Sequence, residues 1–193
     1  MSKYPSEEQC VTLLDRAGCS NRVIVHCCTV KTVAEVIAKG FDDADKELIV
    51  AGALLHDIGR AKDHTIMHAN VGAEMAERLG LPCELVDIIR KHTGAGLDEK
   101  DVKELGLPKG DYIPRTVEEK IVAHADNLVS DNRVVPHTHT VEKLRNKGHD
   151  RGADRVESLH KELSEVYGKD IDDVVSSFVS SALVDLCASL ARE

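Results

Sequence analysis

Apolar residues recur every three or four positions along almost the whole chain, and this helical period is the feature that most limits the fold. The segment that begins after Ser20 shows it clearly. Its apolar stripe consists of Val23, His26, Val30, Val33 and Ile37. Alternating runs of strand length are missing from the sequence, and the Val134-Val135 pair is too short to count as one. The sequence therefore predicts an all-α protein.

Capping signals mark the ends of the expected helices. Ser6 and Gln9 have the spacing of a capping box, and Gly18 and Gly40 are suited to end the first and second helices. After the first helix, the expected ranges are about 21–39, 43–58, 67–79, 82–92, 99–105, 116–131, 139–167 and 170–191. The longest irregular segment, residues 93–115, holds one short helix and has the length of a lid loop.

Composition and charge exclude several classes of function. Lys and Arg number 25 against 34 Asp and Glu, which gives a formal charge of −9, so a basic surface for nucleic acid or an anionic membrane is missing. Aromatic residues make up 3% and disfavour stacking on single-stranded bases. No apolar stretch approaches the ~20 residues of a membrane span, and residues 1–8 lack the apolar core of a signal peptide. We expect one domain over residues 1–193, located in the cytoplasm.

The cysteines fit the same interpretation. The six are Cys10, Cys19, Cys27, Cys28, Cys83 and Cys187. No two of them have C-x-x-C spacing, so neither a zinc finger nor a disulfide framework is indicated. We expect free and mostly buried thiols.

Ionisable residues occur where the pattern predicts burial. His56 and Asp57 lie in the segment ALLHDIGR, at the apolar end of an expected helix. Burying both there costs free energy unless a partner charge, hydrogen bonds or a metal ion compensates. Further residues at helix ends or on apolar faces are His26, His68, His92 and Asp126.

Each of these residues alone has a simpler interpretation. A lone His on an apolar face is more often a core residue than a metal ligand. Asp57 is suited to cap a turn, and Asp126 is suited to form an ion pair with a buried Arg. His64 and His68 both suit the surface. The joint order H…HD…H…H…D favours a metal site instead, because a set of nitrogen and carboxylate donors suits Fe, Mn, Co, Ni or Zn.

Five segments together resemble a known family. They are VIVHCCTVKTVAEVIA around His26, AGALLHDIGR around His56, HANVGAEMAERLGLP from His68, IIRKHT at His92 and IVAHADNLVS around Asp126. On these segments the chain resembles the HD-domain metal-dependent phosphohydrolases, in particular the HDIG subgroup and archaeal single-domain HD proteins. The resemblance covers about residues 20–135 and implies an HD/PDEase-like helical core, on which helices of residues 139–191 would pack.

The resemblance also implies the metal ligands. A first ion would be held by His26, His56, Asp57 and Asp126, and a second by His68, His92 and the bridging Asp57. His64 competes with His68, and the HANVGAEM context favours His68. His124, two residues before Asp126, is expected to point away from it as a structural residue.

The implied catalytic residues are Asp57, Asp126 and Arg60. Many relatives carry Lys at the position of Arg60, and Arg keeps the charge and adds bidentate phosphate recognition but cannot act as a general acid. Other candidates for phosphate contact, which we expect at the surface instead, are Lys62, Arg115, Lys120 and Arg133. We interpret the highly charged helix from residue 139 onward as a solvated face.

The implied function is hydrolysis of a small phosphomonoester or phosphodiester by water activated at one or two divalent metal ions, iron and manganese among them. The opening section EEQCVTLLDRAGCSNRVIVHC is similar to archaeal HD proteins that resemble enzymes opening a 2′,3′-cyclic phosphate. The segment after His92 lacks the signature of the HD-GYP branch, which disfavours cyclic di-GMP hydrolysis.

Two alternatives stay open. One is a mixed-valent di-iron oxygenase, because a minority HD branch uses the same ligand set. The other is a ligand-sensing module without catalysis, which the complete ligand set disfavours. The expected partner is a small phosphorylated substrate, with neither nucleic acid nor membrane, and an oligomer is left open.

Overall fold

Helices dominate the part of the chain that the computed structural model describes, residues 3–130 and 132–178, so the all-α prediction is confirmed. The helices are α1 (Glu7–Ala17), α2 (Asn21–Ala38), α3 (Lys46–Leu55), α4 (His68–Arg78), α5 (Cys83–Lys91), α6 (Glu99–Glu104), α7 (Val117–Asn127), α8 (His137–Asn146), α9 (Asp150–Tyr167) and α10 (Ile171–Phe178). A 3-10 helix, η1 (Ile58–Ala61), follows α3, and a hairpin of β1 (Val129–Ser130) and β2 (Arg133–Val134) follows α7.

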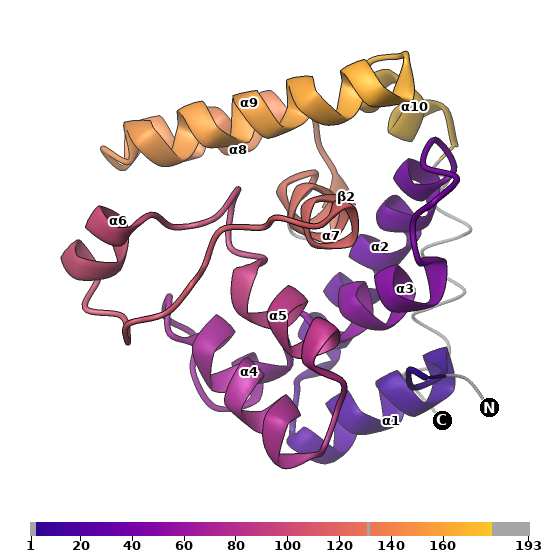
Figure 1. Cartoon of the computed structure of the whole chain (residues 1–193), viewed down its shortest axis with the longest axis vertical. Coiled ribbons are helices and arrows are strands. Elements are labelled where there is room, and N and C mark those ends of the chain that lie inside the picture. The colour runs from indigo at the N-terminus through magenta and orange to yellow at the C-terminus, as the bar shows by residue number, and fades with distance from the viewer. Residues whose placement is uncertain (1–2, 131, 179–193) are drawn as a thin grey trace.

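Helix α2 forms the centre of the hydrophobic core. It is buried along most of its length because α3, α7 and α10 pack against it. Figure 1 shows α7 end-on beside α2, with α1, α4 and α5 grouped on one side of the pair and α8 and α9 lying along the other. The metal-ligand candidates of the sequence therefore belong to elements that surround α2 and α7.

The helix expected over residues 139–167 is wrong as a single element. It consists of α8 and α9, which pack against each other. Between them, Gly148 adopts a φ of +77°, a left-handed conformation that glycine tolerates and that ends α8. The charged run therefore folds back on itself.

The helix expected over residues 116–131 ends earlier, at Asn127. Residues 129–130 and 133–134 instead pair as antiparallel strands, and Asn132 between them has a φ of 62°. The expectation of no strand fails here because a two-residue strand is too short to show alternation. Of the helix expected over residues 170–191, the first part is α10, and the rest lies outside the described residues.

The segment of residues 93–115 holds only the short helix α6, as predicted, and Figure 1 shows α6 set apart from the core. Arg155 of α9 fastens this segment. Its Nε donates to the Gly96 carbonyl at 3.0 Å, Nη1 donates to Asp98 at 3.1 Å, and its guanidinium also pairs with Asp101. The proposed lid loop is thus bound to the α8–α9 layer.

Two further expectations concern the thiols and the membrane. The described cysteines carry free thiols: Cys10, Cys19, Cys27 and Cys28 are buried and Cys83 is exposed, while Cys187 lies outside the described residues. Within the described part of the chain, no helix has both the length and the apolar character needed to cross a bilayer.

Candidate metal centre

The six residues predicted as metal ligands meet at one place, although they come from different elements. His26 lies in α2, His56 caps the end of α3, Asp57 follows it, His68 begins α4, His92 caps the end of α5, and Asp126 lies in α7. They form overlapping groups whose donor atoms lie within 4.8 Å of one another. The structure thus brings together all six.

One half of the centre surrounds the Asp126 carboxylate. Asp126 Oδ1 lies 2.9 Å from His26 Nε2 and 3.6 Å from His56 Nε2. Asp57 Oδ2 completes this half, at 3.8 Å from His26 Nε2 and 3.7 Å from His56 Nε2. Two imidazole nitrogens and two carboxylate oxygens therefore converge, which is a donor set that suits a divalent transition metal.

The other half shares Asp57. Its second oxygen, Oδ1, lies 3.1 Å from His68 Nε2 and 3.6 Å from His92 Nε2. The two histidine Nε2 atoms lie 3.0 Å from each other. Asp57 thus directs one carboxylate oxygen to each half, which is the geometry that a bridging ligand requires.

Backbone contacts fix the tautomers of three histidines. The Nδ1–H groups of His56, His68 and His92 donate to the carbonyl three residues earlier, at 2.7, 2.6 and 2.8 Å respectively. In each ring Nε2 is therefore the nitrogen that faces the centre. Metal-binding histidines are commonly oriented in this way by a hydrogen bond from the other ring nitrogen.

The centre contains polar atoms that the described residues do not satisfy. His56 Nε2 and Asp57 Oδ1 are buried and make no hydrogen bond with described residues. His68 and His92 also direct two Nε2 atoms at each other across 3.0 Å while their Nδ1–H groups are engaged elsewhere. Buried polar atoms are rarely left unpaired. A bound cation would satisfy all of these atoms, so the residues present fit a metal centre.

The electrostatics agree with this fit. Burial would raise the pKa of Asp57, but His56, His68 and His92 hold it well below its usual value. Burial likewise acts to raise the pKa of Asp126, and hydrogen bonds from His26 and His56 outweigh it and lower that pKa. Both carboxylates are therefore ionised. Burial lowers the pKa of His92, which favours its neutral, ligating form.

Gly59 explains why His68 comes close to Asp57. A Cβ atom at Gly59 would collide with the His68 carbonyl and would lie 2.6 Å from Gly72 N. Without a side chain, η1 packs directly on the first turns of α4. The glycine of the HDIG sequence thus sets the distance between the two halves of the centre.

A buried ion pair joins the helices that lead to His92 and Asp126. Lys91 of α5 donates to Glu119 of α7 at 2.9 Å, and both side chains are buried. Glu119 Oε2 also accepts from Arg115 N and Thr116 N at the start of α7. This ion pair links α5 to α7 and so helps to fix the position of His92 relative to Asp126.

The structure distinguishes His68 from His64. His68 is buried within the centre, whereas His64 is exposed and lines the cleft above it. His124 is fully buried and points elsewhere, with Nε2 3.1 Å from His160 Nδ1, as predicted. The geometry therefore favours His68 as the ligand.

A second His and Asp group, which the sequence analysis missed, joins α8, α9 and α10. Its members are His137, His160 and Asp172. Asp172 accepts from the backbone N and the Nδ1 of His137, at 3.1 and 2.7 Å, and so caps the start of α8. The His137 and His160 rings stack 3.6 Å apart. Capping and stacking give this group a structural role in attaching α10.

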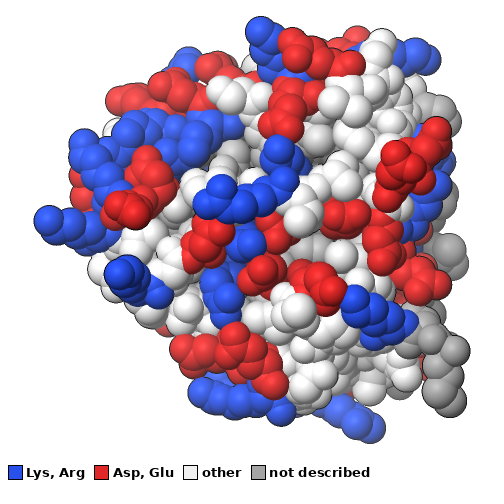
Figure 2. All heavy atoms as spheres, in the orientation of Figure 1, with Lys and Arg blue, Asp and Glu red and all other residues white. Residues whose placement is uncertain are grey.

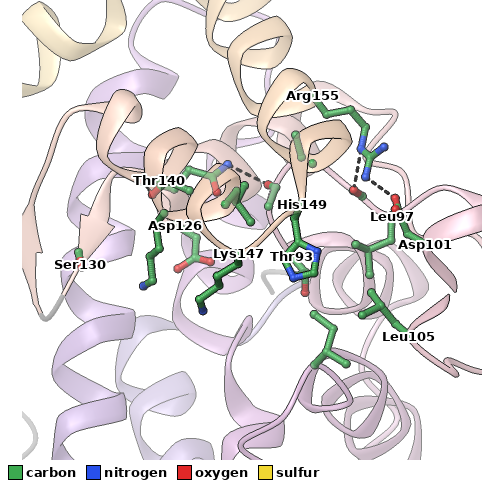
Figure 3. Close-up of a pocket in the computed structure, with 18 of the residues that line it drawn as sticks. Thr93, Leu97, Asp101, Leu105, Asp126, Ser130, Thr140, Lys147, His149 and Arg155 are labelled. Carbon is green, nitrogen blue, oxygen red and sulfur yellow. Dashed lines mark hydrogen bonds and ion pairs between the residues drawn. The ribbon is translucent and has the colours of Figure 1, made fainter.

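A cleft of about 1000 Å³ opens above the metal centre. His26, Asp57 and Asp126 lie at its floor, and the loop before α6 and the α8–α9 turn form its walls. Figure 3 shows Asp126, Thr93 and His149 facing this space from different elements. The cleft therefore offers a substrate a path to the centre between α6 and the α8–α9 turn.

Of the candidates for phosphate contact, Arg60, the one that the sequence favoured over four residues expected at the surface, lines the cleft and donates from Nε to Asp57 Oδ2 at 2.5 Å. The others, which lie outside the cleft lining, are Lys62, Arg115, Lys120 and Arg133. The sequence analysis missed Lys143 and Lys147, which line the cleft from α8 and its C-cap. Interpreting the charged helix as a solvated face was therefore incomplete. Their spacing of four residues, which places both on one helix face, was the available signal.

Comparison with known proteins places these observations in a family. The sequence profile described as HD domain matches residues 23–131. The chain is 44% identical over 173 residues to a protein of Picrophilus torridus named tRNA (cytidine(56)-2'-O)-methyltransferase, covering 89% of this chain and 50% of that protein. It is 43% identical over 134 residues to an uncharacterized protein of Methanocaldococcus jannaschii, covering 67% of this chain and 79% of that one.

The chain spans about half the length of the first of these relatives, whose name describes the longer protein. Among solved structures, the HD domain of the L. monocytogenes phosphodiesterase PgpH matches with a TM-score of 0.56 and 17% identity. The match covers 88% of this chain and 99% of that structure. At this identity the likeness shows a shared fold.

Proposed function

The chain belongs to the HD-domain family, and on that premise we propose that it is a metal-dependent phosphohydrolase that cleaves a small phosphomonoester or phosphodiester. The observation that carries the proposal is the shared Asp57. Its two oxygens serve two groups of histidines, and buried atoms in both groups lack a partner. The HD domain of PgpH, which has the same fold, comes from a protein named a phosphodiesterase.

The proposed ligand sets follow the two halves of the centre. His26, His56, Asp57 and Asp126 would hold one ion, and His68, His92 and Asp57 the other. Bound there, divalent ions supply Lewis acidity for a phosphoryl oxygen and for an attacking water. Imidazole and carboxylate donors suit manganese and iron.

Arg60 is proposed to hold the phosphate group. Its Nε donates to Asp57 and its Nη2 lies 3.4 Å from His68 Nε2, while the guanidinium lines the cleft, so its Nη1 is the nitrogen best placed to donate to phosphate oxygens. Because Arg stays protonated, it can stabilise the charge on those oxygens but does not supply a proton. Its proposed role is therefore binding and charge stabilisation.

Asp126 is proposed to orient water. Its side chain is 24% exposed and faces the cleft. Because neighbouring histidines keep its pKa low, its carboxylate accepts a hydrogen bond from water without retaining a proton. In the reaction, the water oxygen bonds to phosphorus, the ester P–O bond breaks, and the proton lost by water balances the one gained by the leaving oxygen.

The test is phosphate release by protein loaded anaerobically with Mn²⁺ or Fe²⁺. The substrates are 2′,3′-cyclic nucleotides, nucleoside monophosphates and dinucleoside polyphosphates. For the diesters, whose cleavage yields a phosphomonoester, a phosphomonoesterase that leaves the intact diester untouched is added to release phosphate from that product. Metal-dependent turnover that Asp57→Ala abolishes and the exposed control Asp15→Ala retains supports the proposal. A fully metal-loaded protein that hydrolyses none of them overturns it, and oxygen consumption would then test the oxygenase alternative.

A further inference from the structure

The cleft continues past the metal centre along the α8 wall, where two lysines face it. Lys143 lies in α8 and Lys147 is its C-cap, four residues apart and therefore on one side of the helix. Both side chains are exposed and both line the cleft. Figure 3 shows Lys147 reaching into the pocket that Asp126 also faces. The lysines and the metal centre thus share one continuous space.

These lysines differ from Arg151 and Arg155, which line the same wall of the cleft. Arg151 pairs with Asp101 at 2.7 Å and with Glu104 at 2.9 Å. Arg155 pairs with Asp98 at 3.1 Å. Lys143 and Lys147 have no carboxylate within 4 Å among the described residues. Figure 2 shows Lys and Arg gathered, among acidic side chains, where α6 and the start of α9 lie.

Unpaired cations beside a cleft in a chain of net charge −9 favour an anionic ligand at that point. In the proposed function the reacting phosphate lies at the metal centre and Arg60, so these lysines would meet a second anionic group of the same ligand. An ammonium on a flexible stem suits a phosphate approached from one side. Two of them one helical turn apart suit one phosphate group.

Aliphatic side chains lie between α6 and α8 in the same cleft. The lining includes Leu97, Leu105 and Leu144, and Leu105 is 36% exposed. Figure 3 shows Leu97 and Leu105 on the α6 side. No Phe, Tyr or Trp occurs among the described residues that line the cleft. A sugar and base could pack on this wall by apolar contact, with little discrimination between bases.

We propose that the cleft binds a substrate with two phosphate groups joined through a nucleoside, one at the metal centre and the other at Lys143 and Lys147. This inference rests on the proposed phosphohydrolase function and names its substrate class. Nucleoside bisphosphates and 5′-phosphorylated dinucleotides share this chemistry.

The first test is calorimetric titration of the Mn²⁺-loaded protein with methylenephosphonate analogues of the ligands below, in which CH₂ replaces each bridging ester oxygen, so that binding is measured without turnover. Adenosine 3′,5′-bisphosphate is compared with adenosine 3′-monophosphate and 5′-monophosphate. We expect the bisphosphate to bind about tenfold more tightly than either monophosphate, as one charge-assisted contact provides. In the Lys143→Gln/Lys147→Gln variant, the ratio of the monophosphate Kd to the bisphosphate Kd falls to within about twofold of unity.

Two matched variants make the test specific. Lys46→Gln/Lys161→Gln removes the same charge from exposed positions outside the cleft and keeps the wild-type ratio. Lys143→Arg/Lys147→Arg keeps the charge at the cleft and retains most of the preference. A wild-type ratio near one, or a ratio that survives Lys143→Gln/Lys147→Gln, overturns the inference.

Turnover measurements then distinguish nucleoside bisphosphates from 5′-phosphorylated dinucleotides as substrates. They also test the phosphohydrolase function separately from the second phosphate site. Adenylyl-(3′,5′)-adenosine and its 5′-phosphorylated form are compared by kcat/KM, beside the bisphosphate itself. Preferential cleavage of the phosphorylated dinucleotide assigns the site to dinucleotides, and cleavage of the bisphosphate alone assigns it to nucleoside bisphosphates. Lysine-dependent binding with no hydrolysis of any substrate overturns the proposed function alone.

Discussion

His26 Nε2 and Asp126 Oδ1 lie 2.9 Å apart, although 100 residues separate them in the chain. The contact is made between two core helices, α2 and α7, which pack against each other. Side chains held by packed helices keep a fixed geometry better than side chains on loops. The position of this pair therefore depends on the packing of the whole core.

Replacing Asp57 by Ala should remove both metal ions, because each half of the centre uses one of its oxygens. Metal content after dialysis, measured by plasma mass spectrometry, should fall from about two ions per chain to near zero, and activity should fall by at least about a thousandfold. Asp15→Ala on the exposed face of α1 is the control and should retain both ions. Full metal content in Asp57→Ala would show that the carboxylate does not bridge.

Replacing His68 by Ala should remove one ion and leave the other, because His68 contacts only the Asp57 Oδ1 half. The expected content is about one ion per chain, and metal-ligand mutations commonly weaken binding by tenfold or more (about 10- to 100-fold even for residues outside the ligand shell). His64→Ala, at an exposed position, should keep both ions. If the two variants exchange these results, His64 is the ligand.

Replacing Arg155 by Ala should loosen the loop that carries α6. Arg155 holds this segment through Gly96, Asp98 and Asp101, and losing charged hydrogen bonds lowers the free energy of local opening. Amide hydrogen exchange over residues 96–104 should accelerate about tenfold, with α2 unchanged. The control is Arg145→Ala, which removes exposed ion pairs between α8 and α9 only. Equal protection in both variants would count against the fastening role.

Thiol alkylation should separate Cys83 from the buried cysteines. Burial raises the pKa of Cys10 to about 12 and that of Cys19 to about 11. Because the thiolate is the nucleophile, a raised pKa lowers reactivity at pH 8, where only about one Cys10 side chain in ten thousand is ionised. Peptide mapping after brief iodoacetamide treatment should find Cys83 modified and Cys10 and Cys19 intact. The two buried thiols should become reactive only as the pH approaches 11 or when the protein unfolds.

The sequence predicted the helices of the core well, and the six residues that it named as ligands lie together in the structure, because both leave local signals. The ionisable residues His26 and Asp126 stand out in apolar helical segments, and HDIG is a contiguous motif. The glycine of that motif, Gly59, is required by the packing, since any side chain at this position would collide with α4. Features that depend on a few neighbouring residues could therefore be predicted from the sequence.

The residues of the cleft wall could not be predicted from the sequence in the same way. The break at Gly148 looked like one glycine within a long charged helix, and the fold-back becomes visible only when α9 packs along α8. Lys143 and Lys147 face a cleft because of that fold-back, whereas their composition alone resembled any solvated helix. Tertiary packing, rather than local propensity, decides which face of a charged helix meets a ligand.

The distribution of the ligands over α2, α3, α4, α5 and α7 also determines when the centre exists during folding. Asp126 is made 100 residues after its partner His26, so the nascent chain has no complete site until α7 has emerged and docked. Packing of the apolar helices is therefore what assembles the centre, and a metal ion that binds the assembled centre stabilises the folded chain. Protein made without metal is expected to lack this part of its stability.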